Sequence, residues 1–173
     1  CASNMNDVLT RFIASGTLEP KETMPTVAPS MDIQIPSSLE RLIYDLEGDT
    51  SSFYNQLQSE KVATLSEDAT KKLQSIFSSK SFDDEMILRE IKDFNKNYDW
   101  IVDPHTATAV SEKVSFGSNL PVVGVATASP EKFSNVISSV ISSFSVKNSE
   151  NTEDYIVCRS DSSTVENTIN EYF

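Results

Sequence analysis

The sequence predicts a helix-rich α/β fold in which helices flank a parallel sheet. Two apolar runs, residues 98–102 and 122–126, have the length and composition of buried strands. Each run is followed by a residue suited to cap a helix, Asp103 or Ser129, and then directly by a proline. Proline is favoured at the first helical position because its missing N–H would have no partner there, and the capping oxygen accepts from the next free N–H groups. Two strand-to-helix turns of one design indicate parallel strands joined by crossover helices.

These two turns are also where a ligand is expected. In open parallel sheets, ligands bind beyond the carboxyl ends of the strands, where helix N-termini present free N–H groups to anions. His105, Thr106, Thr127 and Ser129 all lie at the two turns. We therefore expect a binding site to include this region.

The elements before the first turn are predicted in order. Residues 1–3 are expected to end a strand, and a helix should run from Val8 to about Ser15, with Gly16 as its stop. Residues 17–30 contain three prolines and indicate a loop, whereas residues 31–35 fit either a short strand or the floor of a site.

The pattern Ser37-Ser38-Leu39-Glu40 is typical of a capping box and predicts a helix beyond it. Residues 48–98 are then predicted to be helical and charged, with a break at residues 78–84 and no assigned chemistry. Their apolar stripes are Ala69, Leu73, Ile76 and Phe77, then Ile87, Ile91, Phe94 and Tyr98.

Three helices and one further strand are predicted after the first turn. A helix should run from Pro104 to about Val114 with Gly117 as a stop, and a second helix should follow Ser129. After a polar loop at 147–154, residues 155–158 predict a strand, and a capping box at 163–166 opens a last helix. The second helix has the clearest apolar stripe: Phe133, Val136, Ile137, Val140, Ile141 and Phe144.

The charge balance disfavours several classes of partner. With 14 basic and 26 acidic residues the net charge is −12, which argues against nucleic acid and anionic membranes as partners. No apolar run approaches the roughly 18 residues of a membrane span, and no signal peptide is evident. Cys1 and Cys158 have no metal or disulfide spacing, so we expect no metal site and a reducing, cytoplasmic location.

Four segments, in order, resemble threonine synthase. They are Ala2-Ser3-Asn4-Met5-Asn6-Asp7, the pair Ser30-Met31-Asp32-Ile33 and Leu39-Glu40-Arg41-Leu42, then Asp103-Pro104-His105-Thr106-Ala107, and finally Ala126-Thr127-Ala128-Ser129-Pro130-Glu131-Lys132-Phe133. Each motif alone is a weak signal, but four in one order are specific. The resemblance implies a lyase of amino-acid biosynthesis that converts O-phosphohomoserine and water to threonine and phosphate. It also implies pyridoxal phosphate as cofactor and the tryptophan synthase beta-like fold type II.

The resemblance further implies that residues 1–173 are the C-terminal part of such an enzyme. The chain begins at Cys1 and has four unclustered glycines, whereas the family's glycine-rich phosphate loop and cofactor-binding lysine lie upstream of the first matched motif. We therefore expect no catalytic residue here, an N-terminal half as partner, and inactivity of the chain alone. Residues 48–98 would be an insertion and 155–173 a terminal strand-helix tail. The alternative is a non-catalytic scaffold or partner-binding domain derived from a truncated enzyme.

Five residues are the candidate ligand contacts. The family places a neutral hydroxyl against the pyridine nitrogen of the cofactor, and Thr127 occupies that point of the motif; otherwise it would satisfy backbone groups at a strand end. Asn4 and Asn6 could face the substrate or simply shape a turn. Arg41 could bind an anion or stay solvated. His105, the one histidine, could face the ligand or be a structural residue.

Overall fold

The computed structural model describes residues 1–111, 123–145 and 161–172. Its strands are short and form two separate pairs. Strand β1 (Ala2–Ser3) pairs in parallel with β4 (Lys80–Ser81), and β2 (Thr17–Leu18) pairs antiparallel with β3 (Ala63–Thr64). Most of the regular structure is therefore helical, and each strand pair joins two segments that are far apart in the sequence.

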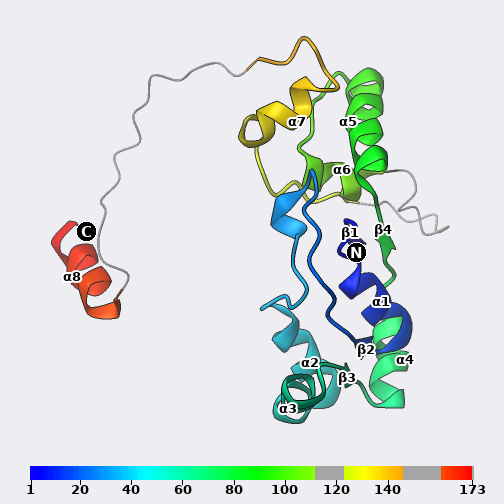
Figure 1. Ribbon diagram of the computed structural model, residues 1–173, viewed down its shortest axis with the longest axis vertical. Helices are drawn as coiled ribbons and strands as arrows, with labels where there is room; N and C mark the ends of the chain where they lie inside the picture. Colours follow the sequence, from blue (N-terminus) through cyan, green and yellow to red (C-terminus); the bar gives the residue numbers. More distant parts are fainter. Residues whose placement is uncertain (112–122, 146–160, 173) are drawn as a thin grey trace.

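One group of helices encloses the first hydrophobic cluster (Figure 1). It contains α1 (Val8–Ser15), α2 (Leu39–Glu47), α3 (Ser51–Glu60) and α4 (Glu67–Ile76). Helix α1 ends at Gly16, which has φ +74°, and a Cβ there would lie 2.2 Å from Thr70 Oγ1, so glycine is required on two grounds. The cluster consists of Val8, Phe12, Ile13, Leu18, Leu39, Ile43, Phe53, Leu57, Ala63, Leu65, Ala69 and Leu73.

A second group lies at the other end of the main body in Figure 1. It contains α5 (Asp84–Tyr98), α6 (Pro104–Val110), the 3-10 turn η3 (Pro130–Phe133) and α7 (Ser134–Ser138). Its buried cluster consists of Ala28, Phe82, Ile87, Ile91, Val102, Ala107, Ile137 and Ile141. Burial of Ile137 and Ile141, with Phe133, Val136, Val140 and Phe144 packed against the cluster, confirms the apolar stripe, although a 3-10 turn and a short helix replace one long helix.

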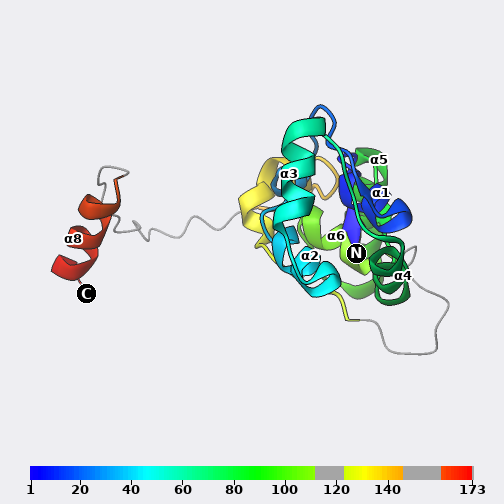
Figure 2. The ribbon, with the colours of Figure 1, turned by 90° about the horizontal axis from the view of Figure 1, so that it is seen from below.

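Residues 19–35 connect the two groups. They leave β2 beside the first cluster, reach α6 with the 3-10 turn η1 (Pro29–Met31), and return to α2. In Figure 2 this segment and α6 lie within the same main body, whereas α8 (Ser162–Tyr172) is described by itself. Within the described ranges, no helix has the length and apolar character needed to cross a membrane.

The two strands expected before the prolines are not strands in the described chain. Tyr98 ends α5 and Asp99 adopts φ +53°, while residues 123–127 belong to no helix or strand. Trp100 is 69% exposed and Val123 84% exposed, and Val122 lies outside the described residues. An apolar extended run needs neighbouring strands to become part of a sheet, and these two runs have none among the described residues.

The remaining predicted helices, strands and caps are confirmed in part. Helix α1 confirms the predicted limits Val8 and Ser15, and residues 31–35 form no strand. Strand β4 falls in the predicted break at 78–84, where it pairs with β1. Neither capping box forms: Ser38 makes no side-chain cap, and the oxygens of Asp161 take that role before α8. Helix α6 ends at Val110, and the loop and strand expected at 147–158 lie outside the described residues.

Candidate functional site

The aspartate that caps α6, Asp103, is buried, and both of its carboxylate oxygens accept hydrogen bonds. Asp103 Oδ1 accepts from the backbone N–H of His105 at 2.9 Å and from its ring Nδ1 at 2.7 Å, and Oδ2 accepts from the Thr106 hydroxyl. Asp103 is 1% exposed. The predicted cap before Pro104 is therefore confirmed, and it also fixes the orientation of the His105 ring.

His105 connects α6 to the segment that carries η1. Its Nε2 accepts a hydrogen bond from the backbone N–H of Ser30 at 3.1 Å, so Nε2 carries a lone pair and Nδ1 carries the proton given to Asp103. The ring packs against Phe133 with centroids 4.7 Å apart and is 8% exposed as a residue. Both ring nitrogens thus have partners inside the protein.

A second carboxylate, that of Asp32, collects donors from two segments. Its Oδ1 accepts from Asn4 Nδ2 at 2.6 Å, from Asn6 Nδ2 at 3.0 Å and from Thr26 Oγ1 at 2.7 Å. Its Oδ2 accepts from the backbone N–H of Thr26 at 3.0 Å. Asp32 therefore joins the turn after β1 to residues 24–34.

The two candidate asparagines are buried in this network. Asn4 is 0% and Asn6 4% exposed. Asn4 Oδ1 accepts from the backbone N–H of Asn6, whereas the Asn6 amide exchanges hydrogen bonds of 2.8 Å with both backbone groups of Met24. Each amide thus shapes the turn and holds the passing segment.

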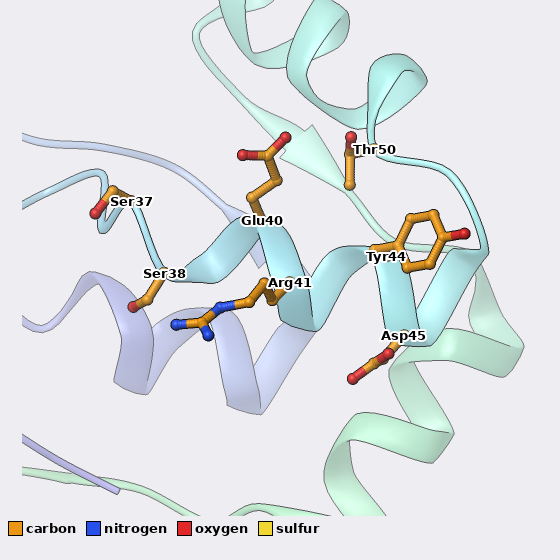
Figure 3. A pocket seen from close by; sticks show the side chains of 7 residues that line it. All are labelled: Ser37, Ser38, Glu40, Arg41, Tyr44, Asp45 and Thr50. Carbon is orange, nitrogen blue, oxygen red and sulfur yellow. The ribbon is translucent and has the colours of Figure 1, made fainter.

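Arg41 lies apart from this network, on the exposed face of α2. It lines a pocket of about 630 Å³ together with Ser37, Ser38, Glu40, Tyr44, Asp45 and Thr50. Figure 3 shows its guanidinium extending along the helix in the direction of Ser38. Within the described chain Arg41 makes no hydrogen bond or ion pair, so its five donors are available, although two carboxylates share the pocket.

Thr127 lies on the exposed segment, residues 123–127, that leads towards η3. Ser129 caps this turn by position, without a side-chain bond to the backbone, and its hydroxyl donates to the Glu131 carboxylate. Thr127 is exposed, so its hydroxyl is open to a group outside the described chain. An exposed hydroxyl fits a contact to a pyridine nitrogen, which needs one donor and no charge.

The structure thus brings three of the five candidates together. Asn4, Asn6 and His105 all form hydrogen bonds with backbone groups of residues 24–34. Arg41 and Thr127 lie outside this network. Sequence reasoning quoted Asp32 within a matched motif but did not single it out. Its signal was available: Asp32 is the one acidic residue of the matched motif Ser30-Met31-Asp32-Ile33.

No protein-family model matches the chain. Individual proteins do: the threonine synthase of Pseudomonas aeruginosa is 30% identical over 79% of this chain and 30% of its own length. That of Eremothecium gossypii is 27% identical over 83% and 32%. A solved structure of PLP-bound threonine synthase from Brucella melitensis is 30% identical with a TM-score of 0.72, over 80% of this chain and 31% of that one.

The chain is homologous to the C-terminal part of threonine synthase. The yeast enzyme's crystal structure agrees, with a TM-score of 0.74 and 25% identity over 90% of this chain and 35% of that chain. These matches confirm the resemblance carried by the four motifs and the α/β fold class of fold type II. The chain spans about a third of the length of the threonine synthases that it matches. "Threonine synthase-like 1" of Homo sapiens is also similar, 33% identical over 79% of this chain.

Proposed function

We propose that residues 1–173 act as the C-terminal part of a threonine synthase. The reaction is the conversion of O-phosphohomoserine and water to threonine and phosphate, with pyridoxal phosphate as the cofactor. The observation that carries the proposal is that four ordered motifs lie within a chain whose fold matches a PLP-bound threonine synthase at a TM-score of 0.72. When bound, the cofactor supplies the electron sink for this chemistry.

In this proposal the chain contributes binding groups rather than the reacting lysine. The Thr127 hydroxyl meets the pyridine nitrogen, and the free guanidinium of Arg41 binds an anionic group of the substrate. Asn4, Asn6 and His105 serve the substrate site by fixing residues 24–34. The glycine-rich loop and the lysine that holds the cofactor come from the N-terminal half, with which the chain works in the cytoplasm.

The exposed apolar runs support the need for that partner. Trp100, Val123 and Val125 are 69%, 84% and 69% exposed, although their sequence pattern is that of buried strands. Under the same proposal residues 48–98 are a helical insertion and residues 155–173 a terminal tail. The same exposed surface would serve the second candidate function, a non-catalytic domain that binds a protein partner.

One experiment tests the proposal and separates the two functions. The complete native polypeptide that carries residues 1–173 is assayed for phosphate release from O-phosphohomoserine with pyridoxal phosphate, beside residues 1–173 alone. We expect activity and stoichiometric cofactor absorbance from the complete polypeptide and neither from the isolated chain. Cofactor retained by residues 1–173 after dialysis and trapped on one of its lysines would contradict the assignment of that lysine to the N-terminal half. A complete polypeptide without activity or bound cofactor would favour the non-catalytic function.

A further inference from the structure

Residues 19–35, which we call the strap, are held by side chains of other elements and by side chains of the strap itself. Apart from the 3-10 turn η1, the strap contains no helix or strand. Five of its backbone N–H groups nevertheless donate to side chains at least six positions away in the sequence. The acceptors are Gln34 for Lys21, Asn6 for Met24, Asp32 for Thr26, Asp84 for Val27 and His105 for Ser30.

Among these acceptors, Asp32 alone takes donors from both the strap and the turn after β1. The amides of Asn4 and Asn6 both end on Oδ1, at 2.6 and 3.0 Å, and Thr26 supplies two further donors. A carboxylate is suited to this position because it accepts several hydrogen bonds and, when ionised, donates none. Bonds to an ionised acceptor are also stronger than bonds between neutral groups.

We propose that Asp32 is a positioning residue, whose carboxylate fixes Asn6 and residues 30–33 of the strap in the geometry that the substrate site requires. This inference rests on the proposed function, because the site it serves is that of the threonine synthase reaction. The matched motif that carries Asp32 contacts two others: the turn at Asn4 and Asn6 through Asp32 itself, and the start of α6 through the bond between Ser30 and His105. Ser30 and Ile33 are the exposed members of this segment.

Asp32→Asn is the informative substitution because it keeps the shape and changes the hydrogen bonding. An amide has one acceptor oxygen, and its NH₂ would confront donors of Asn4, Asn6 or Thr26. At least one buried donor then loses its acceptor, so the strap should open more often while the two hydrophobic clusters stay intact. Asp93→Asn is the matched control, since Asp93 is exposed on α5 and the substitution removes the same charge.

The experiment uses the complete native polypeptide and measures two things. Hydrogen exchange should accelerate about tenfold or more at the amides of Met24, Thr26 and Ser30 in Asp32→Asn, with no change in α4 or α5. Turnover of O-phosphohomoserine should show a rise in KM and a loss of kcat/KM of about ten- to a hundredfold, with an unchanged cofactor spectrum. Asp32→Glu, which keeps the carboxylate, should recover part of kcat/KM, and Asp93→Asn should match the parent in both measurements.

Two results would overturn the positioning role. One is unchanged exchange in the strap of Asp32→Asn. The other is a loosened strap with parental kcat and KM, which would make Asp32 a purely structural residue. A parent polypeptide without activity would instead refute the proposed function, and with it the substrate site; the exchange measurement would still report whether Asp32 holds the strap.

Discussion

At the scale of single residues, two buried or half-buried carboxylates organise the candidate site. Asp103 orients His105, and Asp32 gathers Asn4, Asn6 and Thr26. Asp103 accepts from a free N–H group in the first turn of α6, and Asp32 accepts from an N–H group of the strap, where no helix or strand supplies an acceptor. Asn4, Asn6, Asp32 and His105 each form a hydrogen bond with a backbone group of residues 24–34.

Thr127 permits a residue-scale prediction about the cofactor. Thr127→Ser keeps the hydroxyl and should be mild, whereas Thr127→Ala should weaken cofactor binding by about 0.5–1.5 kcal/mol, the contribution of one neutral hydrogen bond. Thr127→Asp should favour a protonated pyridine nitrogen and change both the absorbance spectrum and the ratio of products. Cofactor affinity, spectra and products of the complete polypeptide provide the measurement. Parental values for both Ala and Asp variants would show that Thr127 does not touch the cofactor.

Individual residues show where sequence reasoning succeeds and where it stops. The cap at Asp103 could be predicted because the pattern Asp-Pro acts within a few residues of chain. The bond between His105 and Ser30 spans 75 positions and follows from tertiary packing alone, so no local pattern encodes it. For the same reason the matched motifs could nominate His105, Asn4 and Asn6 as candidate ligand contacts, but their shared hydrogen bonds to the strap could not be predicted.

At the scale of elements, helices were easier to anticipate than strands. Val8–Ser15 could be delimited because spacing and Gly16 both mark it, whereas the strands of two residues each carry no periodicity. Strand β4 exists only because Ala2 and Ser3 lie beside it in parallel register. The predicted strand at 98–102 failed in the described chain because its composition indicates burial but cannot supply the neighbouring strands.

Two residues of helix α4 test which positions of its predicted apolar stripe stabilise the fold. Leu73 is 0% exposed in the first cluster, whereas Ile76, on the same predicted stripe, is 62% exposed. Leu73→Ala should lower the free energy of unfolding by about 2–5 kcal/mol, because it leaves a cavity in a packed core. Ile76→Ala should change it by no more than about 0.5 kcal/mol. Urea unfolding of the two variants beside the parent provides the comparison. An equal loss in both would mean that Ile76 is covered in the folded protein.

Helix α8 should respond to acid through its capping carboxylate. The pKa of Asp161 is lowered, first by the hydrogen bond from the Thr164 backbone and then by the hydroxyls of Ser163 and Thr164. A lowered pKa in the folded state means that the cap stabilises the helix fully above the unfolded pKa and is lost as the pH falls through the folded value. NMR titration of the Thr164 amide should therefore follow the protonation of Asp161.

Asp161→Asn is the control for this pH dependence. An asparagine keeps a capping oxygen but does not titrate, so the Thr164 amide should lose its acid transition while the helix persists. A transition of the same size in Asp161→Asn would assign the pH dependence to another group. Glu166→Gln, which removes a carboxylate inside the helix, should leave the transition in place.

At the scale of the whole molecule, the described chain buries two hydrophobic clusters but leaves several large apolar side chains exposed. Helices surround both clusters, and the strap runs between them. Its backbone N–H groups donate to side chains near both clusters: Asn6, Asp84 and His105. By contrast, Trp100, Val123 and Val125 expose large apolar side chains outside any helix or strand. Since the chain spans about a third of its threonine synthase relatives, the proposed N-terminal half is the partner that suits this surface.

A charge placed in the exposed run should separate folding from assembly. Val123 is 84% exposed, so Val123→Lys should leave the circular dichroism spectrum and the unfolding midpoint of residues 1–173 unchanged. If the run is buried against the N-terminal half, the lysine forfeits the roughly 1.5–3 kcal/mol of a buried valine and adds the cost of desolvating a charge. Association with a separately expressed N-terminal half, measured by calorimetry, should then weaken at least about tenfold. Ile76→Lys, a lysine at an exposed position on α4, is the matched control and should associate like the parent. Parental affinity in Val123→Lys would place the contact with the N-terminal half elsewhere on the chain.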